Sequence, residues 1–470
     1  MKINIDDLTT VNLSIDPVAK LFFYKNRVLR AIQPEFTSHV NNIIHSSLLT
    51  ELISSNYFPK TWISDIEIDG YTLILEHEMI IHWNYPYEWS FEMLKDVALF
   101  ILDINKIANR YGYELQDPHP YNVIFNMNQP QYIDFGSFVT KKQSKWSGYN
   151  LYLNYVYTPL YFWSCGYPTI AKNIFLMADI FPEKEYFRFR YAFFALFGNR
   201  FFSHMYKVYY SIKIVVLSSD AKLKEKIQSP FLYFIAFLIK KIFNNQFSIK
   251  KLINEIKIFK YKSGTSMWSN YQADIDIQNN ERFMKISAYI NQLSDAHSLL
   301  ELASNHGKFA SYIYDNSHIK KIIATDYDNT AVDIMYLNNK SKQGFLPLLF
   351  DMIRTNGRIE DQPICNRIKC DIVIALAVTH HLILTQDIPI DYIFNTLKNL
   401  SHKYVIVEFM PIGLYAGEVE YVPQLPKYYN VIWFKEKFEN YFDLFHDEQL
   451  EINRHIFIGT IKADCNETTH

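Results

Sequence analysis

The stretch that most constrains the fold is Ser298-Leu-Leu-Glu-Leu-Ala-Ser-Asn-His-Gly-Lys-Phe309. Its apolar start, Ser298–Leu302, predicts a buried strand, and Lys308–Tyr314 predicts the first turns of a helix. A tight turn between a buried strand and a helix brings backbone and free N–H groups close to a ligand, as in nucleotide-binding sheets. The stretch therefore predicts an α/β domain, and the alternative at this point is an ordinary strand–turn–helix without a ligand.

The residues of the turn narrow the choice of ligand. Ala303 and Asn305 stand where G-x-G-x-x-G has glycines, and only Gly307 is left to allow close packing or a positive φ. A dinucleotide pyrophosphate requires those glycines, whereas S-adenosylmethionine (SAM) has no phosphate. We therefore expect SAM, with its methionine portion cradled by the backbone from Glu301 to Gly307, including Ser304.

Four further apolar segments predict the rest of a parallel sheet. Ile322–Thr325 ends at Asp326, whose carboxylate can accept hydrogen bonds from ribose hydroxyls. Helical segments at 329–338 and 391–400 lie between the strands, and this alternation predicts a doubly wound, Rossmann-like sheet. Ligands of such sheets bind at the carboxyl ends of the strands. The other three predicted strands are 344–351, which ends at Asp351-Met352, 370–379, which is closed by His380-His381, and 404–411, which contains Glu408.

Residues 263 to about 462 resemble a class I SAM-dependent methyltransferase of a bacterial group labelled nodulation-protein-like. The resemblance rests on an ordered set of motifs: Trp268–Tyr271, Glu301–Phe309, Leu346–Asp351, Ala375–Leu382 and Val407–Pro411. It implies that Asp326 binds the ribose and that Asp351 and Met352 contact the adenine, with Ala377 also at the cofactor. His380 or His381 would act as general base or orient the acceptor, with Glu408 as a weaker candidate.

The amino-terminal part resembles a protein kinase. Asp117 and Asn122 have the spacing of a kinase catalytic loop, and Asp134-Phe-Gly136 follows like a metal-binding loop. In kinases these residues orient the attacking hydroxyl and hold magnesium on the phosphates. A strand, a helix, another strand and a long helix from Ser90, the predicted cap, to Tyr111 precede the loop in the kinase order.

The kinase set is incomplete. No glycine-rich loop precedes Asp117, and the predicted strand Val28–Ile32 carries Arg30 where a kinase has lysine. The forked guanidinium is no simple substitute for a compact ammonium. We therefore interpret the kinase-like part as degenerate and do not expect Mg-ATP to bind.

These patterns divide the chain into three parts. They are a kinase-like α+β module (1–145), a helical, aromatic-rich remainder with a linker (146–262) and the methyltransferase domain (263–462). A fragment starting near Ser263 is expected to bind SAM by itself. Residues 36–54 are predicted to form one helix, from apolar residues at helical spacing.

Composition excludes several other classes. A net charge of −2 gives no electrostatic basis for nucleic-acid binding. The four cysteines form neither a metal-binding pattern nor a disulfide framework, so we expect no metal and a reducing, cytoplasmic location. The longest apolar run, Phe231–Ile239, is too short to span a bilayer.

The leading functional hypothesis is methyl transfer from SAM to an unidentified acceptor, for which the resemblance suggests a glycan or small-molecule hydroxyl. Two alternatives remain: a phosphotransferase or ATP-binding module fused to a methyltransferase-like domain, and a non-catalytic scaffold. The oligomeric state does not follow from the sequence.

Overall fold

The computed structural model describes residues 1–10, 16–143, 145–177, 248–261, 276–353, 357–358, 361–415 and 424–462. Residues 1–149 and 261–470 belong to one compact unit, and residues 150–260 form a second. The predicted Trp268–Tyr271 segment and the apolar run Phe231–Ile239 lie outside the described residues. In the described part of the chain, no helix has the length and apolar character needed to cross a membrane.

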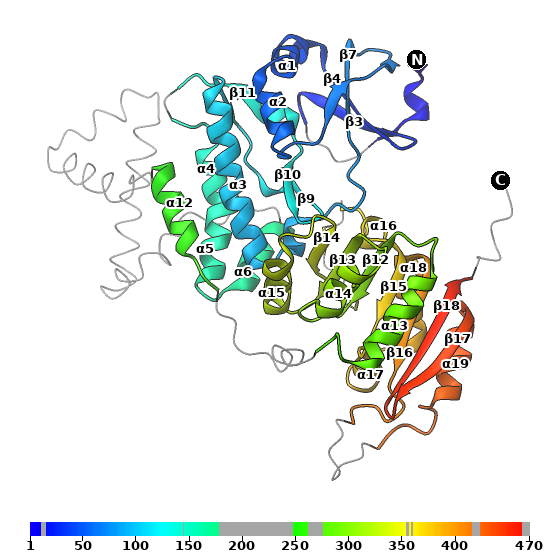
Figure 1. The fold of residues 1–470 in the computed structure, drawn as a ribbon. Coiled ribbons are helices and arrows are strands. Elements are labelled where there is room, and N and C mark those ends of the chain that lie inside the picture. The colour runs from blue at the N-terminus through cyan, green and yellow to red at the C-terminus, as the bar shows by residue number, and fades with distance from the viewer. Residues whose placement is uncertain are drawn as a thin grey trace, which may run out of the picture. The chain divides into compact units, whose positions relative to one another are not determined.

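One mixed sheet of seven strands forms the carboxyl-terminal half, in the order β14-β13-β12-β15-β16-β18-β17 (Figure 1). Five strands are parallel, and β18 runs antiparallel to both its neighbours. The chain reverses its direction of strand addition between β12 and β15, where such sheets bind ligands. The strands are β12 (Ser298–Leu302), β13 (Lys321–Asp326), β14 (Phe345–Leu349), β15 (Cys370–Ala375), β16 (Ser401–Phe409), β17 (Phe442–Glu451) and β18 (Arg454–Ile461).

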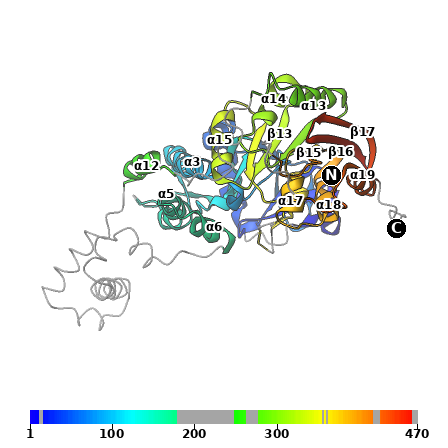
Figure 2. The same cartoon turned by 90° about the horizontal axis from the view of Figure 1, so that it is seen from below.

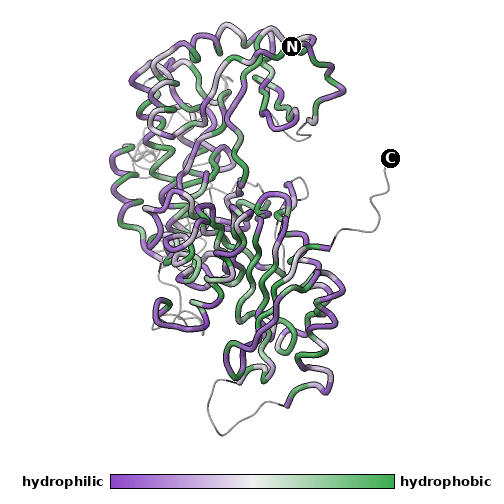
Figure 3. Tube along the Cα trace, turned by 45° about the vertical axis from the view of Figure 1, so that its right-hand side comes forward, coloured by the Kyte–Doolittle hydropathy of each residue, from purple (hydrophilic) through white to green (hydrophobic). Residues whose placement is uncertain are grey.

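Helices cover both faces of this sheet, as Figures 1 and 2 show. The central strands are almost wholly hydrophobic (Figure 3), as expected for parallel strands buried on both sides. This arrangement confirms an α/β, Rossmann-like class for this half. One face carries α13 (Glu281–Gln292), α14 (Lys308–Asn316) and α15 (Asn329–Asn339), and the other α17 (Thr379–Leu384), α18 (Ile390–Leu400) and α19 (Val431–Glu439); α16 (Ile364–Arg367) precedes β15.

A second, antiparallel sheet of five strands lies near the amino terminus, in the order β2-β3-β4-β7-β5. Its strands are β2 (Thr9–Thr10), β3 (Ala19–Tyr24), β4 (Arg27–Ile32), β5 (Thr61–Ile63) and β7 (Leu73–His77). After it come the long α3 (Phe91–Arg110), β8 (Tyr113–Leu115), β9 (Val123–Asn126), β10 (Gln129–Tyr132) and β11 (Phe138–Thr140), while β1 (Lys2–Ile3) pairs with β6 (Glu67–Ile68).

The remaining elements are short or belong to the second unit. Short 3-10 helices cover Ile5–Asp7, Pro34–Phe36, Pro86–Glu88, Pro120–Asn122 and Phe135–Ser137. After α4 (Tyr149–Tyr152), the second unit contains a π-helical turn (Leu153–Tyr157), α5 (Thr158–Ser164), α6 (Pro168–Met177) and α12 (Ile249–Ile258).

Two sequence-based element predictions are wrong. The predicted helix 36–54 is two helices, α1 (Thr37–Ile44) and α2 (Ser47–Ser54), because Ser46 is extended and its hydroxyl donates to the Ile43 carbonyl at 2.6 Å. The strand predicted to run to Thr379 ends at Ala375, and α17 begins at Thr379. Between them Ala377 adopts a left-handed conformation with a φ of 51°, which ends the extended backbone.

Candidate functional site

The turn after β12 has a left-handed residue at every second position. Ala303 and Asn305 have φ values of 51°, and Gly307 has 67°. A Cβ atom at Gly307 would lie 2.6 Å from Cγ of Met335, so close packing against α15 requires a glycine there. The turn thus has three residues in the left-handed conformation that glycine adopts most easily, but only one of them is a glycine. At Ala303 this conformation has a steric cost, because the side chain carries a Cβ atom.

The N–H groups of this turn bond within the protein. Those of Ser304, Asn305 and Gly307 donate to the Thr325 carbonyl, the Asp326 carboxylate and the Ser304 carbonyl at 2.9, 2.8 and 2.8 Å. The expectation of N–H groups available to a ligand is therefore wrong at these three residues. Carbonyl oxygens are the alternative backbone groups for a ligand here, and they suit an ammonium rather than a phosphate.

Glu301 and Ser304, both expected at the cofactor, are buried and engaged with neighbouring elements. The Glu301 carboxylate accepts the Ala310 N–H of α14 at 3.0 Å, and burial raises its pKa to about 8. The Ser304 hydroxyl donates to the Thr325 carbonyl at 3.1 Å. In this arrangement both side chains shape the turn.

Asp326 ends β13 with 6% of its surface exposed. Its two carboxylate oxygens accept the N–H groups of Asn305 and Asp328 at 2.8 and 2.9 Å, and burial raises its pKa to about 6. Each oxygen retains acceptor capacity for a further donor. The geometry therefore leaves Asp326 able to receive ribose hydroxyls.

Asp351 and Met352 follow the neighbouring strand β14. Asp326 pairs in register with Leu349 of that strand, so the three predicted adenosine contacts lie on adjacent strand ends. The Asp351 carboxylate accepts the Ile353 N–H at 2.9 Å, and Met352 is buried. The structure thus brings together residues that the sequence placed on separate strands.

The two histidines lie in the first turn of α17, and their ring centroids are 4.0 Å apart. The prediction that they close a strand is therefore wrong, because both belong to a helix. Burial, then His381 and Arg454, lowers the pKa of His380 to about 3, so its imidazole is neutral near pH 7. His381 is half-buried, and burial lowers its pKa as well. His381 is consequently the more accessible of the two possible proton acceptors.

Glu408 is fully buried and bound by two arginines. Arg282 of α13 donates to both carboxylate oxygens at 2.5 and 2.8 Å, and Arg454 of β18 donates at 2.7 Å. The Ala377 N–H donates to the same carboxylate at 2.9 Å. A carboxylate held in this way is unsuited to remove a proton, which contradicts Glu408 as a base. It instead fixes the left-handed Ala377, the expected cofactor residue, between β15 and the histidines.

Sequence reasoning missed Arg282 and Arg454. A signal for Arg282 existed, because it lies beside Phe283 on the face of α13 that also carries Ile286 and Ile290, all buried. A charged residue on an apolar helix face requires a buried partner. Arg454 begins β18, directly after the turn that joins it to β17, and its sequence context gave no comparable signal.

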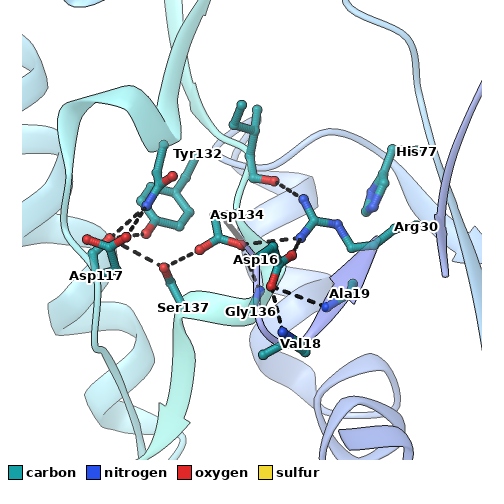
Figure 4. A network of polar contacts seen from close by, with 12 residues as sticks. Asp16, Val18, Ala19, Arg30, His77, Asp117, Tyr132, Asp134, Gly136 and Ser137 are labelled. Carbon is teal, nitrogen blue, oxygen red and sulfur yellow. Dashed lines mark hydrogen bonds and ion pairs between the residues drawn. The ribbon is translucent and has the colours of Figure 1, made fainter. Parts of the chain in front are cut away.

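The three kinase-like residues belong to a second polar network, shown in Figure 4. Asn122 donates to the Asp117 carboxylate at 3.2 Å, and the Ser137 hydroxyl donates to Asp134 at 2.5 Å. Arg30 donates to Asp134 at 3.3 Å and to the Ile133 carbonyl at 3.0 Å. A guanidinium and a hydroxyl therefore occupy the oxygens expected to hold magnesium. Within the described ranges, no group of three or more His, Cys, Asp or Glu side chains could hold a metal ion.

Asp16 completes this network from the segment before β3. Its carboxylate accepts Arg30 at 2.6 Å and the Val18 N–H at 2.9 Å. Burial raises the pKa of Asp16 despite the guanidinium. The chain thus supplies its own anion to Arg30, the residue that stands where a kinase lysine would contact phosphates.

Comparison with known proteins gives one curated relative and many similar folds. Nodulation protein NoeA of Rhizobium meliloti (strain 1021) is 23% identical over 425 residues, which cover 84% of this chain and 83% of NoeA. No family model matches the chain.

Solved structures resemble about half of the chain or less. Magnesium protoporphyrin IX methyltransferase from Synechocystis PCC 6803 with bound SAM is 11% identical, and the match covers 48% of this chain and 96% of that one with a TM-score of 0.31. For the N-methyltransferase NodS from Bradyrhizobium japonicum WM9, the identity is 10%, the coverages are 40% and 99%, and the TM-score is 0.30. The carboxyl-terminal half, with its mixed sheet of seven strands, has a Rossmann-like α/β fold.

Proposed function

We propose that this protein is a SAM-dependent methyltransferase whose cofactor binds at the carboxyl ends of β12, β13 and β14. The observation that carries the proposal is Asp326, a buried carboxylate at a strand end with acceptor capacity left for ribose hydroxyls. Asp351 and Met352 follow the adjacent strand β14, and the turn at Ala303–Gly307 follows β12, the neighbour of β13 on its other side. These are the positions that an adenosine and an amino-acid portion require.

The chain's own residues have separate tasks in this proposal. SAM supplies an electrophilic methyl group on a sulfonium. Carbonyl oxygens of the turn accept hydrogen bonds from the cofactor's ammonium, and Asp326 orients the ribose. His381, next to the buried neutral His380, accepts the proton of an acceptor hydroxyl as the methyl group is transferred to its oxygen. Glu408 and its two arginines hold the loop that precedes the histidines.

Calorimetric titration of the full-length protein with SAM tests the cofactor assignment. Asp326→Ala should weaken SAM binding by about 1–3 kcal/mol, because two ribose hydroxyls lose their acceptor. Asp315→Ala is the matched control, since Asp315 pairs with Lys342 on the outside of the domain and is more than half exposed. Equal SAM affinity in the wild type and Asp326→Ala would remove the ribose assignment.

We also propose that the amino-terminal module is kinase-like in fold and inactive in phosphotransfer. The occupation of Asp134 by Arg30, and of Arg30 by Asp16, supports this. A glycan or small-molecule hydroxyl as acceptor, and a cytoplasmic location, stay predictions. Incubation of a cell extract with labelled SAM and the protein would identify the acceptor.

A further inference from the structure

The helix that follows Asp326 is held along its length by the amino-terminal module. At its first turns, the Asp333 carboxylate accepts the Glu92 N–H at 2.8 Å and so caps α3, where Ser90 makes no side-chain cap bond. In the middle, the Tyr336 hydroxyl donates to Asp96 at 2.7 Å. The predicted capping of α3 by Ser90 is therefore replaced by a residue about 240 positions away.

The end of α15 is held as well. The Asn128 side chain, from the β9–β10 turn, donates to the carbonyls of Asn339 and Lys340 at 3.1 and 2.7 Å. The Lys340 ammonium pairs with Asp96 and lies over the Tyr336 ring. Carbonyls at a helix end lack partners within the helix, so these bonds fix the position of α15.

The segment that follows Met352 contacts the same module. Arg367 and Glu88 form an ion pair with two hydrogen bonds of 2.8 and 2.5 Å, and their side chains are only 1% and 3% exposed. Arg367 also donates to the Trp83 carbonyl at 3.1 Å. Arg358 lies over the Tyr121 ring, with its guanidinium carbon 4.0 Å from the ring centroid.

These contacts reach the two places where adenosine is proposed to bind. Asp326 lies three residues before the first residue of α15, and Asp328 caps that helix through the Thr330 N–H at 2.7 Å. Met352 precedes the segment that carries Arg358 and Arg367. A shift of α15 or of this segment would therefore move Asp326 or Met352 relative to the other.

We propose that residues 82–128 of the amino-terminal module are a structural part of the cofactor site and position its adenosine side through α15, Arg358 and Arg367. The inference rests on the proposed function, because it concerns the affinity for SAM. It gives the module a role that needs no ATP and no phosphoryl transfer. Asp333, Tyr336 and Arg367 are then positioning residues, which act through Asp326 and Met352 without touching the cofactor.

The first test compares two kinds of full-length variant by calorimetry with SAM and by thermal unfolding. The triple variant Asn128→Ala, Asp333→Ala, Tyr336→Phe removes the bonds that hold α15. We expect a folded protein whose SAM affinity is about tenfold weaker, within the usual range for coupling between sites. Tyr404→Phe is the control, since it removes another tyrosine–aspartate bond, to Asp295 at 2.8 Å, within the methyltransferase domain. Its affinity should stay within about twofold of wild type, a difference too small to indicate coupling.

A second variant covers the case in which the triple variant fails to fold. Glu88→Met with Arg367→Met replaces the buried pair by apolar side chains of similar length, an exchange that proteins often tolerate. It should also weaken SAM binding by about tenfold, because the chain loses the buried pair that holds residue 367 against the amino-terminal module. A folded variant of either kind with wild-type affinity overturns the inference, whereas a wild type that does not bind SAM overturns the proposed function and the inference with it.

Reciprocal coupling gives a readout that a merely structural contact would not change. If the module and the cofactor site are coupled, saturating SAM must stabilise the contact between Asp333 and the start of α3. Hydrogen exchange at the Glu92 amide should therefore slow when SAM is added to the wild-type protein. Unchanged exchange at this amide, with SAM bound, would contradict the inference.

Discussion

The two polar centres of this protein differ in the groups that bind their acidic residues. In the amino-terminal module, Asp134 is paired with Arg30, which is in turn paired with Asp16. At the edge of the seven-stranded sheet, Asp326 accepts the N–H groups of Asn305 and Asp328, and no salt bridge to it is found among the described residues. Burial raises the pKa of Asp326 to about 6.

Under our proposal, the amino-terminal module keeps the residues of a kinase-like site but does not bind its ligand. Asp117 and Asp134 lie in one network (Figure 4), in which Asn122 donates to Asp117 and the Arg30 guanidinium donates to Asp134. At the sheet edge the carboxylate is oriented by backbone donors, which leave room for a further donor. The hydrogen-bond and ion-pair partners of the carboxylates therefore distinguish the two centres better than the sequence motifs do.

The largest effect expected at the sheet edge concerns turnover. His381→Ala should lower methyl transfer by about 10²–10⁴-fold while SAM still binds, because a general base contributes about that much. The measurement is incorporation of label from SAM into the acceptor, once the acceptor has been identified. His380→Ala is the matched control: it should mainly lower the unfolding temperature, since His380 is buried. Near-normal turnover in both variants would mean that neither histidine acts as a base and that the site works only by positioning the acceptor.

Removal of Arg30 should leave the acids of the amino-terminal network without an arginine partner, as Asp326 is at the edge of the seven-stranded sheet. Arg30→Met should destabilise the protein by about 1–3 kcal/mol, because Asp16 and Asp134 lose their partner in a largely buried place. Added Mg²⁺ should then raise the unfolding temperature of this variant and leave that of the wild type unchanged. Arg27→Met, on the same strand, is the control, since Arg27 pairs with Asp65 and Glu76 instead. An Mg²⁺ response in the wild type would contradict the occupation of the site by Arg30.

The buried carboxyl group of Glu301 predicts a specific pH dependence of stability. The pKa of Glu301 is about 8 in the folded protein and near 4.5 when unfolded, so the folded state binds its proton more tightly. This contribution is fully present below pH 4.5, and the free energy of unfolding should decline as the pH rises towards 8. Glu301→Gln should flatten the decline between pH 6 and 8. Equal slopes for both proteins in urea unfolding would show that Glu301 titrates normally.

The smallest expected effect concerns the strained turn. Ala303→Gly removes a left-handed alanine, which costs about 1–2 kcal/mol, but adds about 0.5–1 kcal/mol of chain entropy loss. The net result should be a stabilisation of about 0–1.5 kcal/mol, measurable by urea unfolding. Ala310→Gly, in the helical α14, should instead destabilise by about 1 kcal/mol. A destabilised Ala303→Gly variant would argue against the turn geometry.

The structure also changes the outlook for a fragment that starts near Ser263. The sequence predicted that such a fragment binds SAM, because every residue assigned to the cofactor follows that point. In the folded chain, however, Arg367, Asp333 and Tyr336 have their partners at Glu88, Glu92 and Asp96. We now expect the fragment to bind SAM more weakly than the full-length protein does, and a calorimetric comparison of the two decides between these expectations.

The sequence by itself determined where the parallel strands of the carboxyl-terminal sheet lie, although not where each of them ends. The predicted bounds of β12 (298–302) agree with the structure, and Asp326 ends β13 as expected. Local patterns suffice here, because a buried parallel strand must be almost wholly apolar and its ligand-facing residue must follow directly.

The tertiary structure decided which charges meet. Arg282, Glu408 and Arg454 are far apart in sequence, and so are Asp16, Arg30 and Asp134, yet each set forms one network. Their pairing depends on strand register and on which face of a helix is buried. The left-handed Ala377 is a similar case, because its N–H bonds to Glu408, and only the folded chain brings that carboxylate to the end of β15.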